Sequence, residues 1–305
     1  MKGCDNSKQQ SRLRQVCDYI GQHLDDDLNL ERLSQVGHLS RFHFHRLFLA
    51  ATGMALSRYV LLQRLKRASF RLAFEPQRKV IDIGLEAGFD SAEAFSRAFK
   101  RYFNQTPSQF RSSPDWPNWH SVMTLATPVT GEIKVDVNLV EMAPQNVAQL
   151  VHSGDPARLM ETAKLFIEWR KASGLSPITS SRTYGIPNGD PNTMAPAAFR
   201  FRFCGTLGDA SLEADGNANH ESAAALVPAN PQGVVGAVVS GGRYAVVRHL
   251  GSHDGMDATI YAFFREWLPV SGESIRDEPL FFHYINFIHQ VDECDLITDI
   301  YLPLE

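Results

Sequence analysis

Apolar residues recur every three or four positions through the first hundred residues, and this spacing predicts amphipathic helices. Leu13, Val16 and Ile20 mark the first helix, from about residue 10 to residue 24. Further helices are expected at 30–36, 41–51 and 56–74, and the last of these stops before a proline. The first part of the chain is therefore predicted to be helical throughout.

Residues 78–103 predict a short helix, a turn at Gly88 and a second helix. Phe95 and Phe99 are four positions apart and share the buried face of the second helix, whereas Arg97 and two further cations lie on other faces. A helix-turn-helix of this kind can present polar and cationic side chains to a DNA groove.

This unit occurs twice. The stretch from Phe44 to Phe48 has the pattern of the stretch from Phe95 to Phe99, 51 positions later, and Leu39 corresponds to Phe89 at a shift of 50. The long helix predicted between the two units would hold their second helices roughly 34 Å apart, which is one turn of DNA.

From Lys134 the pattern changes to alternation, which predicts strands. Strands are expected at 134–139, 147–152, 182–186, 198–204, 234–239 and 243–250, with an amphipathic helix at 156–172. Ser240-Gly241-Gly242 predicts a hairpin turn between the last two of these strands. Two stretches lack either period: 112–131 is expected to be a linker, and 205–232 a linker or irregular insertion.

The second half of the chain also repeats. His152 corresponds to His249 at a shift of 97, Trp169 to Trp267 at a shift of 98, and Tyr184 to Tyr284 at a shift of 100. Two βαββ copies are expected, paired about a pseudo-twofold axis, with their helices on one face of an antiparallel sheet.

Charge separates the two halves. Residues 1–120 carry 18 Lys and Arg against 12 Asp and Glu, a balance of +6, and the remaining residues carry 12 against 22, a balance of −10. Only the first half is suited to a polyanion. Four cysteines without CxxC spacing fit a reducing compartment and no zinc site. We expect a cytoplasmic protein with no membrane segment, no metal and no cofactor.

Residues 9–111 resemble the DNA-binding domain of the AraC/XylS family of transcription regulators. The resemblance rests on Leu39-Ser40 and the segment 44–48 in the first unit, and on Ala87-Gly88-Phe89, the segment 95–99 and Thr106-Pro107-Ser108 in the second. It implies DNA contacts from the second helix of each unit, by Arg41, Phe42, His45, Arg46, Ser91, Ala92, Glu93 and Arg97. Arginine can pair with guanine, and glutamate can accept a hydrogen bond from cytosine.

Further cations near these helices are expected to contact phosphates: Arg64, Lys66, Arg67, Lys100, Arg101 and Arg111. His38 stands where the first turn of the family usually has glycine. A left-handed backbone at His38 would cost about 1 kcal/mol, so slight strain is predicted.

Residues 132–305 resemble the GyrI-like small-molecule-binding domain. The resemblance rests on the segments 242–251, 267–272 and 298–304, with Gly189-Asp190-Pro191 in the first copy. It implies a cleft between the copies for flat hydrophobic ligands. Several members place a glutamate there, but Phe282 occupies that position here, so a neutral or weakly charged aromatic ligand is favoured over a dication. The pocket candidates are Trp169, Trp267, Phe282, Tyr284 and Tyr301.

The predicted fold class is α+β: an all-α double helix-turn-helix domain at 1–111, a linker at 112–131, and an antiparallel α/β domain of two βαββ repeats at 132–305. The predicted function is sequence-specific binding of double-stranded DNA by a transcription regulator that senses a small hydrophobic effector, with RNA polymerase as a further partner. Alternatively, the second domain binds a partner protein or hydrolyses a small substrate. The hydrolase would lack its acid at Phe282, and we expect no enzyme.

Overall fold

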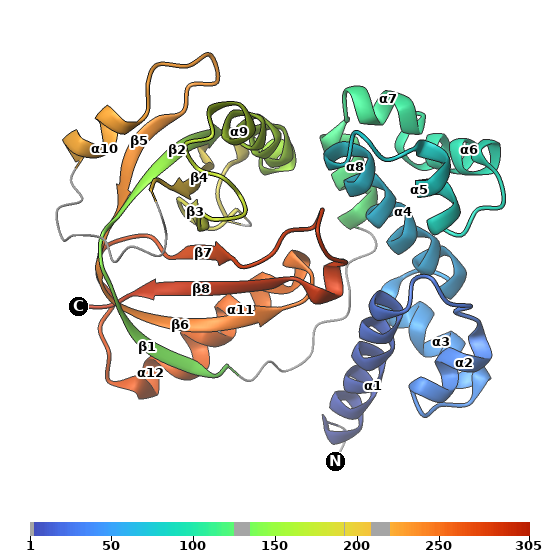
Figure 1. The fold of residues 1–305 in the computed structure, drawn as a ribbon. Helices are drawn as coiled ribbons and strands as arrows, with labels where there is room; N and C mark the ends of the chain where they lie inside the picture. The colour runs from blue at the N-terminus through green and yellow to red at the C-terminus, as the bar shows by residue number, and fades with distance from the viewer. Residues whose placement is uncertain (1–2, 125–134, 192, 209–219) are drawn as a thin grey trace. The chain divides into compact units, whose positions relative to one another are not determined.

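The computed structural model describes residues 3–124, 135–191, 193–208 and 220–305 (Figure 1). It divides into two compact units. The first contains residues 1–133 together with 251–258 and 287–296, and the second contains 134–250, 259–286 and 297–305. Among the described residues, no helix is long and apolar enough to cross a membrane.

The first unit is helical. Its helices are α1 (Gly3–Gln22), α2 (Leu30–Val36), α3 (Arg41–Thr52), α4 (Leu56–Phe74), α5 (Val80–Glu86), α6 (Ala92–Phe103), α7 (Pro107–Ser112) and α8 (Trp116–Met123). The bounds of α2 and α4 are those predicted from the apolar spacing, and α3 is one residue longer. The all-α double helix-turn-helix prediction is confirmed for this part of the chain.

Helices α3 and α6 are built alike. Each has 12 residues and begins at a serine, Ser40 or Ser91, whose side chain accepts a hydrogen bond from a first-turn backbone N–H. Each ends at a residue in the left-handed conformation, Gly53 or Asn104. The turn before α3 places His38 at a φ of 50°, as predicted, whereas glycine occupies the turn before α6.

The stretch predicted as a linker contains a helix. Trp116 and Trp119 are 2% and 7% exposed, and their rings pack against Phe70 at centroid distances of 6.1 and 5.2 Å. Burial of two tryptophans makes α8 part of the helical core, so the linker prediction fails for residues 116–123. Prolines near a helix start are compatible with helix, and the proline-based signal did not distinguish the two cases.

The second unit is an eight-stranded sheet in the order β1-β6-β8-β7-β3-β4-β2-β5. The strands are β1 (Val137–Met142), β2 (Gln145–Ser153), β3 (Thr183–Pro187), β4 (Arg200–Thr206), β5 (Val235–Val239), β6 (Gly242–Leu250), β7 (Phe281–Tyr284) and β8 (Ile297–Pro303). The helices are α9 (Leu159–Ser173), α10 (His220–Leu226), α11 (Met256–Ala262) and α12 (Leu268–Ser271), with a π-helix at Phe263–Trp267. All strand pairs are antiparallel, and the α+β prediction is confirmed.

The hairpin predicted at Ser240-Gly241-Gly242 is wrong. Strand β5 pairs with β2, and β6 pairs with β1 and β8. Gly241 lies where the chain crosses between strands, and a Cβ there would come within 2.6 Å of the Pro144 backbone nitrogen. The glycines therefore serve a close backbone crossing, which the sequence does not distinguish from a tight turn. The result is an exchange: the strand preceding each copy pairs with the other copy.

The strand register shows which side chains of β3 and β7 lie on the same face of the sheet. Paired residues in an antiparallel ladder share a face, and Tyr184 pairs with His283 whereas Thr183 pairs with Tyr284. Tyr184 and Tyr284 thus point to opposite faces, and their predicted correspondence at a shift of 100 is wrong. Residues of β3 and β7 lie on the same face of the sheet only when their numbers differ by an odd number. The change from 97 to 98 between the histidines and the tryptophans coincides with the π-helix, which adds one residue to a turn.

Candidate DNA interface and effector site

Helix α3, the predicted reading helix of the first unit (the helix expected to contact bases), separates apolar and polar side chains. Phe44 and Phe48 are 0% and 1% exposed, and they lie inside the unit with their rings 5.6 Å apart. Arg41, His45 and Arg46 are exposed. The predicted contact Phe42 lies outside the side chains that the structure describes. Its helix therefore presents three predicted DNA contacts to solvent.

Helix α6, the predicted reading helix of the second helix-turn-helix, has the same arrangement. Phe95, Phe99 and Phe103 are fully buried, while Glu93 and Arg97 are exposed. The predicted contacts Ser91 and Ala92 are half-buried at the helix start. Ser91 already accepts a hydrogen bond from the backbone N–H of Ala94 at 3.1 Å, so its hydroxyl is committed first to capping.

The exposed arginines of these helices are free to bind an anion. In the part of the chain that the structure describes, Arg41, Arg46 and Arg97 form no ion pair with an acidic side chain. A guanidinium in water can form bidentate hydrogen bonds with phosphate or guanine without first breaking an internal pair. This supports the predicted roles of Arg46 and Arg97.

Three cations of α4, Arg64, Lys66 and Arg67, are different, and the phosphate contacts predicted for them are wrong. The guanidinium of Arg64 donates to the carbonyl oxygens of Leu24 and Asp26, both at 2.8 Å. Lys66 and Arg67 are 5% and 8% exposed. These side chains are used inside the first unit and cannot reach a phosphate without breaking its core.

Lys66 lies between two carboxylates. Its Nζ is 2.7 Å from Asp254 Oδ2 and 2.8 Å from Glu293 Oε1. Burial opposes the ammonium, but the two carboxylates outweigh it and raise the pKa of Lys66. Arg67 pairs with Asp25 and, at 3.1 Å, with Asp292. Helix α4 is thereby fixed by ion pairs to residues that follow it by about 190 to 225 positions in the chain.

In the second unit, helix α9 covers one face of the central strands, which we call the helix-side face. This face carries part of the predicted pocket. Phe282 is 8% exposed and Tyr284 is half-buried. Gly185 pairs with Phe282, and a Cβ on it would lie 2.6 Å from both the Phe201 ring and the Tyr284 hydroxyl. Glycine is therefore required for two aromatic side chains to meet above β3. Burial raises the pKa of Tyr284, so its hydroxyl stays protonated at neutral pH.

The other pocket candidates are not all gathered there. Tyr301 pairs with Phe281, and the two rings stack at 4.6 Å on the opposite face of the sheet. Trp169 is 4% exposed and stacks on Phe166 in α9. Trp267 is half-buried in the π-helix, 5.2 Å from the Phe263 ring. Two of the five candidates thus share one face of β7, and Tyr301 is separated from them by the sheet.

One buried cation near Tyr284 had no signal in the sequence. Arg170, the residue after Trp169 in α9, is 2% exposed. Its Nε donates to the Ser176 carbonyl at 2.6 Å, and its Nη1 donates to Thr183 Oγ1 at 2.6 Å. Burial lowers the pKa of Arg170 to about 10, which still leaves it positively charged at neutral pH.

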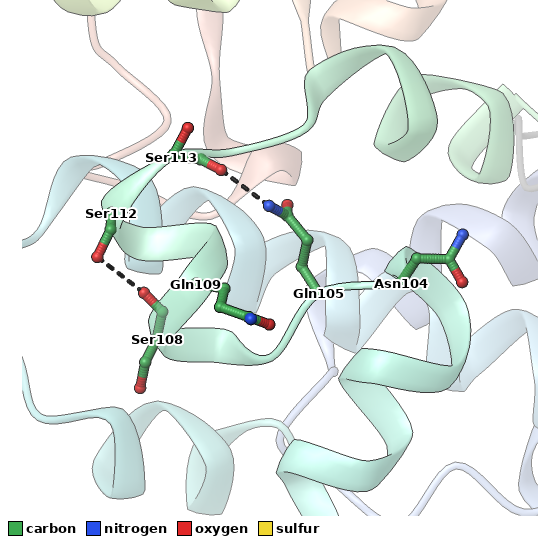
Figure 2. A pocket seen from close by; sticks show the side chains of 6 residues that line it. All are labelled: Asn104, Gln105, Ser108, Gln109, Ser112 and Ser113. Atoms are coloured by element: carbon green, nitrogen blue, oxygen red, sulfur yellow. Dashed lines mark hydrogen bonds between the residues drawn. The ribbon is translucent and has the colours of Figure 1, made fainter.

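A polar pocket of about 530 Å³ lies in the first unit (Figure 2). It is lined by Asn104, Gln105, Ser108, Gln109, Ser112 and Ser113. Several of its polar groups are already paired: Gln105 donates to the Ser113 carbonyl at 2.9 Å, and Ser112 donates to the Ser108 carbonyl at 3.0 Å. The lining lacks aromatic side chains, and we do not assign an aromatic effector to it.

These features define a class: a DNA-binding transcription regulator with a helix-turn-helix domain followed by a second, ligand-binding type of domain. Residues 33–113 match the model of a helix-turn-helix domain, and the domain is of AraC type. Residues 136–305 match the GyrI-like small molecule binding domain. This match covers more than half of the chain, and the chain belongs to that family.

Two curated relatives each match one of the domains. The chain is 40% identical over 172 residues to the "Probable transcriptional regulator YgiV" of Escherichia coli (strain K12), which is 56% of this chain and 98% of that protein. It is 36% identical over 104 residues to the "Right origin-binding protein" of the same organism, covering 34% of this chain and 36% of that protein. The solved EcmrR C-terminal domain is 16% identical, with a TM-score of 0.42 over 57% of this chain and 99% of that chain.

Proposed function

We propose that this protein is a cytoplasmic transcription regulator that reads a bipartite site in double-stranded DNA and answers to a small aromatic effector bound by its second domain. The observation that carries the DNA part is the contrast within the first unit. The arginines of α3 and α6 are exposed and form no ion pair among the described residues, whereas Lys66 and Arg67 of α4 are buried and paired with carboxylates. RNA polymerase is the expected macromolecular partner of a regulator of this class.

The two reading helices support a bipartite site. They have equal length, equal capping and corresponding arginines, Arg46 and Arg97, which differ by the repeat shift of 51. If each arginine pairs with a guanine, each contributes about 1–3 kcal/mol of discrimination. Neither helix then suffices alone, and both half-sites are required for tight binding.

The experiment is selection of bound duplexes from a random pool, followed by gel shift of the selected sequence. We expect the double variant Arg46→Ala and Arg97→Ala to lose about 2–6 kcal/mol of binding free energy and its sequence preference. Arg158→Ala is the matched control, because Arg158 is an exposed arginine of the second unit. Unchanged selectivity in the double variant would refute the assignment of the reading helices.

For the effector, we propose the helix-side face of β3 and β7, where Phe282 and Tyr284 lie. Aromatic side chains there can stack on a flat ligand. Trp169, Trp267 and Tyr301 remain candidates from the resemblance, with Tyr301 the weakest because it faces the other side. A panel of aromatic compounds should give saturating increases in melting temperature, and Phe282→Ala should reduce them. Equal shifts in wild type and variant would place the ligand elsewhere.

A further inference from the structure

The second unit contains a buried guanidinium without an acidic partner. Arg170 is 2% exposed and, among the described residues, forms no ion pair with an acidic side chain. A buried charge is normally paired, because transfer of an isolated charge from water is costly. Its ring neighbour, Phe166, lies 5.7 Å from Cζ and provides a cation–π contact, but not a counter-ion.

Two hydrogen-bond donors around this guanidinium are also unused. Arg170 Nη2 and Ser176 Oγ are buried and have no hydrogen-bond partner among the described residues. Ser176 is 0% exposed. Buried polar groups are satisfied in the great majority of native proteins, so two adjacent exceptions require an explanation. Both are N–H or O–H groups, and together with a positive charge they are suited to an acceptor that carries negative charge.

The backbone is shaped to bring these donors together. Gly205 lies beneath them in β4, and a Cβ there would come within 2.4 Å of Ser176 Oγ and 3.2 Å of Arg170 Cζ. Any other residue at 205 would displace the serine hydroxyl or the guanidinium. The close approach therefore depends on glycine, as expected of a built site.

The site adjoins the proposed effector face. Thr183, whose hydroxyl accepts a hydrogen bond from Arg170, pairs with Gly205 on one side and with Tyr284 on the other. The helix-side row across the sheet is thus Gly205, Thr183 and Tyr284. Adjacent strands are about 4.8 Å apart, so the guanidinium and the Tyr284 ring are within the length of one small aromatic acid.

We propose that the effector of this protein is an aromatic acid, whose carboxylate is bound by Arg170, Ser176 and Thr183 beneath α9 while its ring lies against Tyr284 and Phe282. This inference rests on the proposed effector face and specifies the chemistry of its ligand. A carboxylate neutralises the positive charge of Arg170 and accepts hydrogen bonds from Nη2 and from the serine hydroxyl. Because Phe282 stands where several family members have a glutamate, no carboxylate at that position repels the bound anion.

The test uses full-length protein and three probes of one shape: 2-naphthoate, 2-naphthamide and 2-naphthylmethylamine. Isothermal titration should give the acid an affinity at least tenfold higher than the amide, with no measurable binding of the amine. Arg170→Met should remove the advantage of the acid, and Arg170→Lys should restore part of it. Arg182→Met is the control, because Arg182 is exposed and lies just outside β3.

The outcomes separate the two proposals. Phe282→Ala should weaken the acid and the amide alike, because it removes ring contacts and not charge. If the probes bind regardless of charge, or if Arg170→Met keeps the preference for the acid, the aromatic-acid assignment is wrong while the effector face stands. If no probe binds, or if sodium chloride alone stabilises wild type in an Arg170-dependent way, an aromatic-acid effector is also excluded. DNA selectivity of the Arg170 variants reports separately on the first unit.

Discussion

Lys66 and Arg170 are both cations inside the protein, and their surroundings are opposite. Lys66, in α4 of the first unit, is held by Asp254 and Glu293 at 2.7 and 2.8 Å. Among the residues that the structure describes, Arg170, in α9 of the second unit, meets a carbonyl, a hydroxyl and an aromatic ring but no acidic side chain. Burial acts against the charged form in both, but carboxylates raise the pKa of Lys66, whereas nothing offsets burial at Arg170.

The difference distinguishes a cation with a structural role from one that, under the proposal above, binds a ligand. The charge of a lysine between two carboxylates is compensated, and such a lysine serves to fix α4 in place. An arginine that keeps a charge and a free donor has capacity left for a ligand. Pairing therefore matters more than burial when buried cations are considered as candidate sites. The following predictions test that distinction from the largest effect to the smallest.

Replacing Lys66 by Met should have the largest effect. The change leaves Asp254 and Glu293 without their shared cation. Because these side chains are 39% and 20% exposed, we expect a loss of about 1.5–3 kcal/mol, the range for hydrogen bonds to charged groups. Urea unfolding at neutral pH measures the loss. A loss below about 1 kcal/mol would mean that the carboxylates are hydrated, and the contrast with Arg170 would disappear.

Acid should weaken the same pair more gradually. Lys66 lowers the pKa of Asp254 against the effect of burial. A carboxyl whose pKa is depressed by folding contributes stability above its ordinary pKa of 3.8, and this stability is lost as the pH falls through the folded value. We expect the free energy of unfolding to fall more steeply below pH 4 in wild type than in Lys66→Met. Parallel curves would contradict the pairing.

Replacing Arg170 by Met should change stability little. The variant loses two hydrogen bonds, each worth about 1 kcal/mol, but it also removes an uncompensated buried charge. We expect a net change within about 1 kcal/mol, read from the same urea unfolding curves. A loss of 3 kcal/mol or more would show that Arg170 is as structural as Lys66.

Arg158→Ala gives the smallest effect and completes the series. Arg158 pairs with Glu161 at 3.2 Å, but the two side chains are 58% and 39% exposed. Exposed pairs contribute about 0–1 kcal/mol because water and salt screen them. A stability change near zero would confirm that pairing at the surface does not resemble pairing around Lys66.

Much of the fold was predictable because many of its elements are determined by residues close to one another in the sequence. The apolar spacing of α2 and α4, the capping serines before α3 and α6, and the left-handed His38 all depend on residues within one or two turns. Alternation also located six of the eight strands that the structure describes, whereas β7 and β8 were not predicted. Strand pairing did not, because the glycines at 241 and 242 are equally compatible with a hairpin and with a crossing.

The candidate sites were predictable to the extent that exposure follows from helical periodicity. The outward positions of Arg46 and Arg97 follow from the phenylalanines four apart on the other face. Lys66 and Arg67 carried the same cationic signal, but their acidic partners lie 42 residues away at Asp25 and about 190 to 225 residues away at the others, which no local pattern reveals. Arg170 and Gly205 were missed for the same reason, since their proximity exists only in the folded sheet.

The exchange of β1 and β5 dictates an order of events during synthesis. Val137 of β1 pairs with Val247 of β6, so β1 has no ladder partner until the ribosome has made and released about 110 further residues. Its exposed edge must meanwhile be kept from pairing with other chains. Because each copy lends its leading strand to the other, neither half of the sheet can be completed alone. A nascent chain stopped after β4 would lack both β5 and the partner of β1. We therefore expect the unit to become protease-resistant only once the last strand has emerged.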